Sequence, residues 1–261
     1  MLDGKRIEQL VHRELAVEIF DEIDSTNAEA KRRALMQGAT EKTSPTLLIA
    51  RAQTAGRGRM GRSFHSPEGG GIFMSLLYFT DKPLLDAVSV TTAAAAIVAE
   101  EIERVTSAQM KIKWVNDVYN DRGKVSGILV ETVPVSEKIR GMIVGIGINT
   151  GEDDFPPELS EIASSIGDIR GCENALVAAI AEGLLAHADS PTDKGYMEEY
   201  RKRFMLLGER VSLLSCGEKL DEGVVVGVDD DGGLIYIPDG KNEKVTVRTG
   251  EVSVRKANVN K

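Results

Sequence analysis

Four arginines and six glycines crowd into the stretch from Arg51 to Ser75, which contains the run GRGRMGRSFHSPEGGG. No acidic residue interrupts it before Glu68, although the whole chain carries 32 basic and 41 acidic residues and a net charge of −9. Glycines let backbone N–H groups approach an anion, and guanidinium groups bind carboxylate or phosphate through paired hydrogen bonds. Residues 54–70, the arginine loop, are therefore predicted to cradle a small anionic ligand.

Other interpretations of the arginine loop compete with this one. Gly56, Gly58 and Gly61 spell the G-x-G-x-x-G dinucleotide fingerprint. With Arg62 in place of lysine, the run is also one substitution away from a P-loop. Both motifs require a helix to begin at the phosphate, and Pro67 with the glycines after it opposes a helix, so both are rejected. Nucleic-acid binding is disfavoured because the sequence pI is about 5.1 and no second basic patch is found. A surface loop without a ligand stays open as the alternative.

Length and composition limit the class of protein. A chain of 261 residues can bury a substantial core, and it divides naturally into a large domain, 1–207, and a small domain, 208–261. No apolar run is long enough to cross a membrane, and the charged N-terminus does not resemble a secretory signal. Two distant cysteines and three scattered histidines argue against structural zinc and for a reducing, cytoplasmic location.

Strands and helices are expected to alternate through the large domain. Strands are predicted at 16–21, 46–53, 71–79, 111–114, 118–119, 124–133 and 138–148, and helices at 27–38, 83–104, 173–188 and 196–206. Gly38 is expected to end the first helix, and Asp81 and Pro83 to open the second. Five short β-type runs follow Gly208, at 210–215, 223–228, 234–237, 244–248 and 251–255. Their regular spacing indicates a small barrel.

Three further segments could join the arginine loop in a site. The run KWVND, residues 113–117, places a lysine, an amide and a carboxylate at a strand end, where ordinary turn chemistry is the alternative. Lys124 opens the apolar strand KVSGILVE, and Gly127 permits close approach to its backbone; a lysine that only covers the strand start is the alternative. The run GIGIN ends with Asn149, for which packing under the alanine-rich helix is the favoured alternative.

In this order the segments resemble the biotin protein ligases, also called biotin–[acetyl-CoA-carboxylase] ligases. The resemblance covers residues 18–256. It rests on the Ser25-Thr26-Asn27 turn, GRGRMGR followed by SP-x-GGG-x-x-x-S, then KWVND, KVSGILVE, GIGIN and GEVSVR. The departures are Met60, Phe64, Val115 and Ser126, where the family usually has arginine, tryptophan, proline, and alanine or glycine. They affect loop packing rather than the chemistry.

The resemblance implies an α/β fold, the mixed sheet flanked by helices of the class II synthetase-like biotin/lipoate ligases, followed by an SH3-like β-barrel. Some members also carry an N-terminal DNA-binding domain and repress transcription. Too few residues precede the first predicted strand for such a three-helix domain. The expected protein is a ligase without the repressor half and without specific DNA binding.

The family's reaction brings together two anions, the carboxylate of biotin and the α-phosphate of ATP, so it requires positive charge. By resemblance Lys124, Arg57 and Asp117 are catalytic, with Asp117 as a candidate Mg²⁺ ligand or base. The implied biotin-binding residues are Ser25, Thr26, Asn27, Gln53, Gly56, Arg57, Gly58, Arg59, Lys124, Gly127 and Ile128. The implied ATP-binding residues are Arg62, Lys113, Asn116, Asp117 and Asn149.

The implied substrates are biotin and ATP with Mg²⁺, and neither a prosthetic group nor a covalent enzyme intermediate is needed. Biotinyl-5′-AMP would form first and then react with a lysine of a biotin carboxyl carrier domain. A lipoate ligase and a biotin-sensing regulator are the alternatives. Because the segment 138–148 is apolar, a homodimer joined through it as a sheet edge is expected, with a central strand as the alternative.

Overall fold

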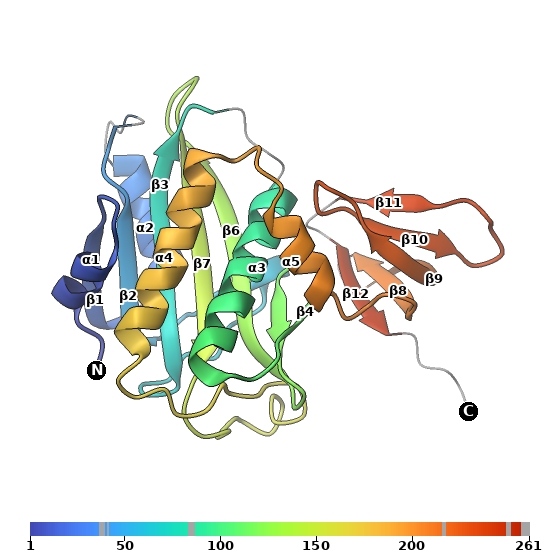
Figure 1. Ribbon diagram of the computed structural model, residues 1–261, viewed down its shortest axis with the longest axis horizontal. Helices are drawn as coiled ribbons and strands as arrows, with labels where there is room; N and C mark the ends of the chain where they lie inside the picture. The colour runs from blue at the N-terminus through green and yellow to red at the C-terminus, as the bar shows by residue number, and fades with distance from the viewer. Residues whose placement is uncertain (37–39, 41, 83–86, 216–217, 249–251, 257–261) are drawn as a thin grey trace.

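The computed structural model describes residues 1–36, 40, 42–82, 87–215, 218–248 and 252–256 (Figure 1). A large α/β part occupies most of the molecule, and a small all-β part lies at one side of it (Figure 1). The fold class expected from the sequence is confirmed. Within the described ranges, no helix has both the length and the apolar character needed to cross a bilayer.

The large part is built on a seven-stranded sheet in the order β1-β2-β3-β7-β6-β5-β4. Only β1 and β2 pair in parallel, and the other neighbours are antiparallel. The strands are β1 (Ala16–Ile23), β2 (Thr46–Gln53), β3 (Gly71–Thr80), β4 (Lys111–Lys113), β5 (Asp117–Tyr119), β6 (Lys124–Pro134) and β7 (Arg140–Asn149).

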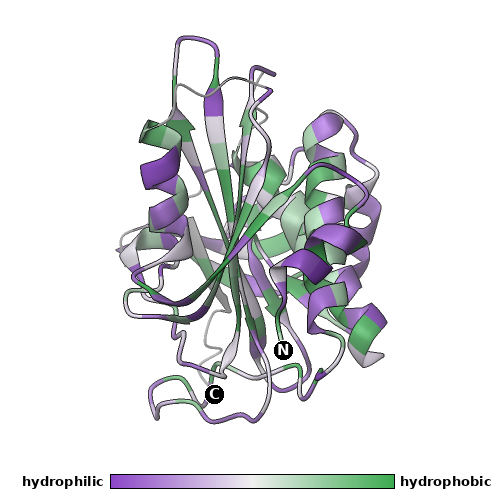
Figure 2. Cartoon of the chain, turned by 90° about the vertical axis from the view of Figure 1, so that its left-hand side faces the viewer, coloured by the Kyte–Doolittle hydropathy of each residue, from purple (hydrophilic) through white to green (hydrophobic). Residues whose placement is uncertain are grey.

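Helices cover both faces of this sheet. On one face α3 (Ala87–Thr106), α4 (Glu173–Asp189) and α5 (Tyr196–Arg203) enclose the larger apolar core, with α1 (Gly4–Leu10) packed beside α4. On the other face α2 (Thr26–Met36) covers a smaller core that includes Ala30, Ala34 and Ile143. Figure 2 shows the sheet between the single helix and the helix group. Because α2 is short, it leaves part of its face of the sheet to other segments.

Strand β7 explains how room is made on that face. Its apolar side chains at the even-numbered positions 142–148 join the larger core, while Gly141, Gly145 and Gly147 point toward the α2 side. Successive side chains of a strand alternate between faces, so Gly145 and Gly147 leave the α2 face open there without weakening the core on the other face. Ile143, on the α2 face as well, packs in the smaller core.

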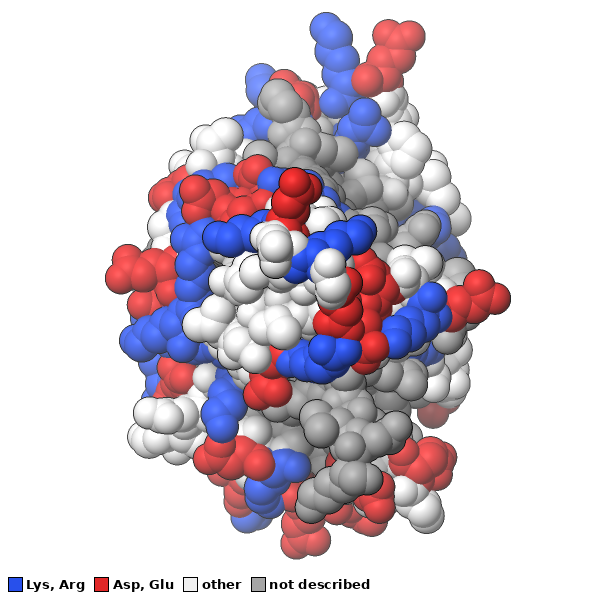
Figure 3. Space-filling view, turned by 90° about the vertical axis from the view of Figure 1, so that its right-hand side faces the viewer, with Lys and Arg blue, Asp and Glu red and all other residues white. Residues whose placement is uncertain are grey.

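The small part is a five-stranded antiparallel sheet in the order β11-β10-β9-β8-β12. Its strands are β8 (Arg210–Ser215), β9 (Glu218–Val228), β10 (Leu234–Pro238), β11 (Val245–Val247) and β12 (Val252–Lys256). Its β9–β10 turn docks on the large part, because Trp114 Nε1 donates a hydrogen bond to Gly232 O at 2.8 Å. Arg201 Nε donates to Val228 O at 3.1 Å beside it. The outward side of this part mixes basic and acidic side chains (Figure 3).

Several sequence expectations need correction. Helix α1 was not predicted; it begins after Asp3, whose carboxylate accepts from Arg6 N and supplies the N-cap. Helix α3 begins at Ala87 and Asp81 is not helical, while Pro83 and Gly38 lie outside the described residues. Helix α5 ends at Arg203, three positions before the expected end at 206. The differences at α3 and α5 arise at helix ends, where local signals are weakest.

The largest correction concerns the expected dimer edge. Strand β7 pairs with β3 on one side and β6 on the other, so the apolar segment 138–148 is a central strand and offers no free edge. Its apolar character reflects burial on the core face rather than an interface. The edge strands of this sheet are β1 and β4.

Candidate functional site

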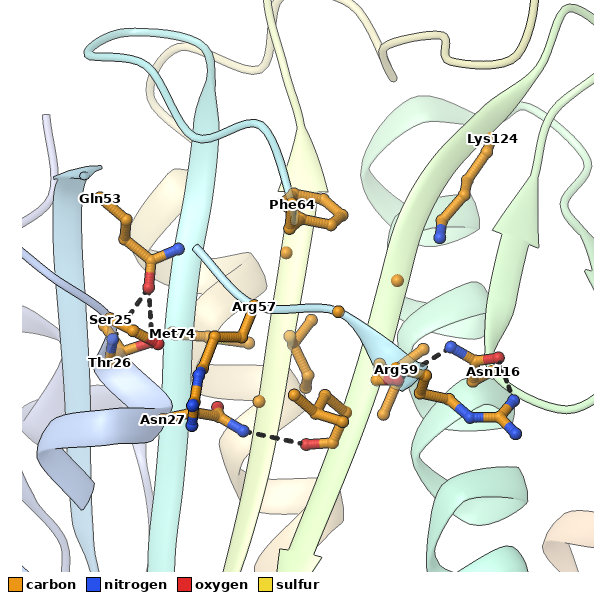
Figure 4. Close-up of a pocket in the computed structure, with 17 residues that line it drawn as sticks. Ser25, Thr26, Asn27, Gln53, Arg57, Arg59, Phe64, Met74, Asn116 and Lys124 are labelled. Atoms are coloured by element: carbon orange, nitrogen blue, oxygen red, sulfur yellow. Dashed lines mark hydrogen bonds between the residues drawn. The ribbon is translucent and has the colours of Figure 1, made fainter. Parts of the chain in front are cut away.

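A cavity opens on the α2 face of the sheet, between the start of α2 and the arginine loop (Figure 4). It is lined by Ser25, Thr26, Asn27, Gln53, Arg57, Gly58, Arg59, Phe64, Met74, Asn116, Lys124, Gly127, Ile128, Leu129, Gly145, Ile146 and Gly147. Four strands (β2, β3, β6 and β7), the start of α2, the arginine loop and the turn between β4 and β5 thus converge here.

Two glycines of β7 form the floor of this cavity. A Cβ atom at Gly145 would lie 1.9 Å from Asn27 Oδ1, and one at Gly147 would lie 2.5 Å from the ring of Phe64. Any other residue would therefore collide with these side chains. The GIGIN run therefore lets the side chains of Asn27 and Phe64 pack directly against the backbone of β7. This role is additional to the packing of the strand under the alanine-rich helix.

The neutral wall of the cavity is formed at the beginning of α2. Ser25, Thr26 and Asn27 are all buried there. Thr26 N donates to Gln53 Oε1 at 2.8 Å, and Asn27 Nδ2 donates to Leu129 O at 3.3 Å and to Glu131 Oε2 at 3.0 Å. These bonds link the helix to β2 and β6, so the polar groups are held in place by the protein itself.

The arginine loop folds back over the cavity as a tight reversal. Gly58 N donates to Arg62 O at 2.7 Å, and Phe64 N donates to Gly56 O at 2.9 Å. Met60, with φ 57°, and Gly61, with φ 72°, adopt left-handed backbone conformations at its tip. Only a three-residue 3₁₀ turn forms there, and no α-helix starts at the glycines. The rejection of the dinucleotide and P-loop interpretations is thus confirmed.

Phe64 closes the cavity from above. Its ring stands edge-on to Phe73 with 6.3 Å between centroids, and it lies against Gly147 and near Gly127. Lys124 Nζ lies 5.9 Å from the centre of the same ring. An aromatic residue at this position separates the neutral wall from the charged end of the site.

The charged end is organised around Lys124 at the start of β6. Its Nζ forms an ion pair with Asp117 Oδ1 at 2.6 Å. Arg59 Nη1 donates to Asn116 Oδ1 at 2.7 Å, and burial lowers the pKa of Arg59 from its ordinary value. The guanidinium stays charged at neutral pH nonetheless, because its ordinary pKa is far above that range.

A second cavity adjoins the first at Lys124 and Arg59. Its lining adds Arg62, Lys113 and Asp117, together with Val254 from β12. The two cavities therefore meet where a lysine, an arginine and a carboxylate are concentrated. Such an arrangement can hold an uncharged polar group in one cavity and a polyanion in the other, with the cations at the junction.

The structure brings most of the predicted site residues together. All implied biotin-binding residues except Gly56 line the first cavity, and so does Asn116. Gly56 is buried under the loop, where a Cβ would lie 2.4 Å from Phe64 O. Asn149 lies outside both linings, and its amide donates to Lys124 O at 3.3 Å and Ser164 O at 3.0 Å. Its hydrogen bonds anchor the start of β6.

Sequence reasoning assigned no role to Phe64, Met74 or Leu129, which line the cavity, or to Ser66 and Ser75, which lie behind it. Phe64 appeared only as a departure from the family pattern. Both serines belong to the SP-x-GGG-x-x-x-S pattern, which was the sequence feature that could have indicated their place near the site. Among the described residues, no group of three or more His, Cys, Asp or Glu side chains converges as a metal site would require.

Known proteins resemble this chain in both of its parts. Residues 20–149 match the Biotin/lipoate A/B protein ligase family, and residues 206–255 match the Biotin protein ligase C terminal domain. The bifunctional ligase/repressor BirA of Bacillus spizizenii is 35% identical over 227 residues, which cover 83% of this chain and 68% of that protein. The biotin–[acetyl-CoA-carboxylase] ligase of Mycobacterium tuberculosis is 29% identical, with 90% of this chain and 88% of that one covered. The BirA protein of Bacillus subtilis is 36% identical, and this chain spans 61% of its length.

Among solved structures, the biotin protein ligase from Aquifex aeolicus in complex with biotin and ATP superimposes with a TM-score of 0.73 at 28% identity. The match covers 92% of this chain and 99% of that one. The similarity therefore extends through both parts of the molecule.

Proposed function

Because the chain belongs to the biotin protein ligase family, we propose that it activates biotin with ATP and transfers the biotinyl group to a lysine of a carrier domain. One observation carries this proposal: Lys124 and Arg59 stand at the junction of a cavity with a neutral, hydrogen-bonding wall and a second cavity whose lining is mainly cationic. The first cavity suits the uncharged ureido ring of biotin, and the second suits the phosphates of ATP. The biotin carboxylate would meet the α-phosphate between them.

In the first step a carboxylate oxygen of biotin attacks the α-phosphorus of ATP. The new C–O–P linkage forms while the bond to the β-phosphate breaks, and pyrophosphate leaves. Lys124 and Arg57 offset the repulsion between the two anions and stabilise charge in the transition state. Arg62 and Lys113 line the second cavity, where they would hold the departing phosphates. Mg²⁺ would enter with ATP, and Asp117 supplies a carboxylate beside that path.

In the second step the amine of the carrier lysine attacks the acyl carbon of biotinyl-5′-AMP, an amide forms and AMP leaves. The attacking nitrogen must lose a proton. Asp117, which is ion-paired with Lys124 Nζ at 2.6 Å, would accept it. Lys124 then stabilises the oxyanion of the tetrahedral intermediate. No side chain of the protein becomes acylated in this scheme.

Ser25, Thr26, Asn27 and Gln53 would bind the ureido ring, with the backbone of Gly127 and Ile128. Asn149 acts indirectly in this scheme, because its amide already binds Lys124 O and Ser164 O. It would fix the strand start from which Lys124 projects. Gly56 and Gly58 would let the arginine loop approach the adenylate.

The wider assignments remain proposals as well. The catalytic domain is placed at 1–207 and the C-terminal domain at 208–261, and the partner is the biotin carboxyl carrier domain of a biotin-dependent carboxylase. Specific DNA binding is not expected, and a homodimer would need an edge other than β7. The cytoplasmic location stays a prediction.

The proposal is tested with a purified carrier domain incubated with the protein, biotin and MgATP, followed by mass spectrometry. A gain of one biotinyl group on one lysine supports it, and an unmodified carrier contradicts it. Replacement of biotin by lipoate in the same assay tests the alternative ligase. A promoter-DNA mobility shift at moderate salt tests the regulator, for which binding is not expected.

A further inference from the structure

Two buried serines lie behind the neutral wall of the site. Ser75 on β3 is 0% exposed and Ser66 in the arginine loop is 4% exposed. Neither lines the cavity, yet both contact residues that do. Together with Gln53, Thr26 and Asn27 they form one hydrogen-bonded group.

The orientation of the Gln53 amide in this group is set by the backbone. Thr26 N lies 2.8 Å from Gln53 Oε1, and a backbone N–H can only donate, so the oxygen of that amide must face Thr26. The nitrogen then faces Ser66, with Nε2 donating to Ser66 Oγ at 3.0 Å. Ser66 Oγ in turn donates a hydrogen bond to Phe64 O at 3.0 Å. Ser66 thus holds the amide in a single orientation.

The Asn27 amide is oriented by the same logic. Its nitrogen lies 3.3 Å from Leu129 O, and a backbone carbonyl can only accept, so Asn27 Oδ1 faces β3. Ser75 donates to this oxygen at 2.6 Å. Ser75 Oγ lies nearly as close to Thr26 Oγ1, at 2.7 Å, and it can donate to either oxygen but not to both at once, because a serine hydroxyl has one hydrogen.

The consequence falls on the Thr26 hydroxyl. Its single hydrogen has Gln53 Oε1 as an acceptor at 3.2 Å, and Ser75 Oγ at 2.7 Å becomes a second acceptor when Ser75 donates to Asn27. Whichever one it chooses, the hydrogen points into the protein, and the cavity receives a lone pair. Thr26 is therefore presented as an acceptor, which suits a ring that carries N–H donors.

We propose that Ser75 is a positioning and specificity-determining residue: together with Gln53 and Leu129 O it holds the hydrogen-bond polarity of Thr26 and Asn27, so that the cavity selects a cyclic urea over a ring without N–H groups. This inference rests on the proposed function, since it concerns the biotin end of that site. Ser66 supports the same polarity from the other end, through Gln53.

The variant Ser75→Ala tests the proposal, and Ser126→Ala is its matched control. Ser126 lies in the same sheet and is also 0% exposed, but its Oγ has no hydrogen-bond partner in the part of the chain that the structure describes. Both variants remove one buried oxygen from a strand. Only the first changes the polarity of the wall.

Isothermal titration with biotin should show the dissociation constant of Ser75→Ala raised about tenfold, and that of Ser126→Ala within about twofold of wild type. At saturating biotin, kcat and the KM for ATP should stay near wild type, because Ser75 is remote from Lys124. Inhibition by lipoate, whose dithiolane ring has no N–H, should be unchanged. A general loss of structure would instead lower kcat and Tm together.

Ser66→Ala offers a second variant that leaves the sheet untouched, and it should weaken biotin binding several-fold with the same separation of KM from kcat. The inference is overturned if Ser75→Ala binds biotin within about twofold of wild type. It is also overturned if Ser126→Ala loses as much biotin affinity as Ser75→Ala. A wild-type protein that binds no biotin overturns the proposed function instead, so the two failures are distinguishable.

Discussion

Around Thr26 and Asn27 the wall of the site is made of neutral side chains whose hydrogen bonds already run to the protein, with Arg57 beside Asn27 (Figure 4). Around Lys124 the site is made of charges that face one another. At the neutral end, Gln53 and Ser75 hold the wall through bonds of 2.6 to 3.2 Å. At the charged end, Lys124 Nζ is paired with Asp117 at 2.6 Å. The neutral end is preorganised, and in the proposed mechanism the charged end would change partners.

The difference follows from what each end would bind. A neutral polar ring gains most from donors and acceptors that are fixed in advance, because little entropy is lost on binding. Phosphates bring their own charge, and a lysine released from a carboxylate can follow that charge as it moves. The predictions below address the two ends in order of expected effect.

The largest effect is expected from Lys124→Met. Loss of the ammonium at the cavity junction should lower kcat/KM for adenylation by about 3 kcal/mol or more, because the charge acts in the transition state. Pyrophosphate release measures this rate. Lys111→Met is a matched control, since Lys111 pairs with Asp121 on the surface. Near wild-type turnover in Lys124→Met would remove this residue from the mechanism.

Gly145→Ala should damage the neutral end. The added Cβ would lie 1.9 Å from Asn27 Oδ1, so Asn27 must move and its bonds to Leu129 and Ser75 must break. Biotin affinity should fall by roughly 2 kcal/mol in a titration, with a smaller change in ATP affinity. Gly4→Ala, where the nearest atom would lie 3.4 Å away, is the control. Equal losses for biotin and ATP would show that the two ends are not separate.

Arg59→Gly should loosen the charged end without abolishing turnover. The guanidinium ties the arginine loop to Asn116 at 2.7 Å, so its removal should release biotinyl-AMP about tenfold faster. Free adenylate acylates lysines indiscriminately, and mass spectrometry of a bystander protein mixed with the carrier would detect it. Modification confined to the carrier lysine would show that the loop does not retain the intermediate.

The smallest effect is expected at Asp24, which supports the neutral end from outside. Asp24 Oδ1 accepts from Ser25 N at 2.8 Å, and hydrogen bonds from Arg32 lower the pKa of Asp24 to about 2. Because this pKa is depressed, the stabilisation is complete above about pH 4 and is lost as the pH falls through 2. Asp24→Asn should therefore cost roughly 0.5 kcal/mol at pH 7.

The stability lost in Asp24→Asn, and its dependence on pH, are measured by thermal unfolding of the variant and of wild type at several pH values. The difference in Tm should persist from pH 7 to pH 4 and shrink below it. A difference that grows toward low pH would contradict the assigned sign.

Local sequence alone was enough to predict most elements and the kind of chemistry. Strand β2 has the predicted bounds Thr46–Gln53, because a run of apolar residues flanked by turn residues defines a strand locally. The absence of an α-helix after Gly56, Gly58 and Gly61 followed from Pro67 and the later glycines. The order of the charged motifs was sufficient to identify the family.

Long-range pairing decided what the sequence could not. Whether an apolar strand such as β7 lies at an edge or in the centre depends on its partners, and here β3 and β6 occupy both sides. Hydrogen-bond partners are set in the same way: Asn149 and Ser75 resemble many other polar residues until distant backbone and side-chain groups meet them. Residue type and spacing therefore determined which groups the protein carries, and tertiary structure determined which of them face the ligand and which hold the others in place.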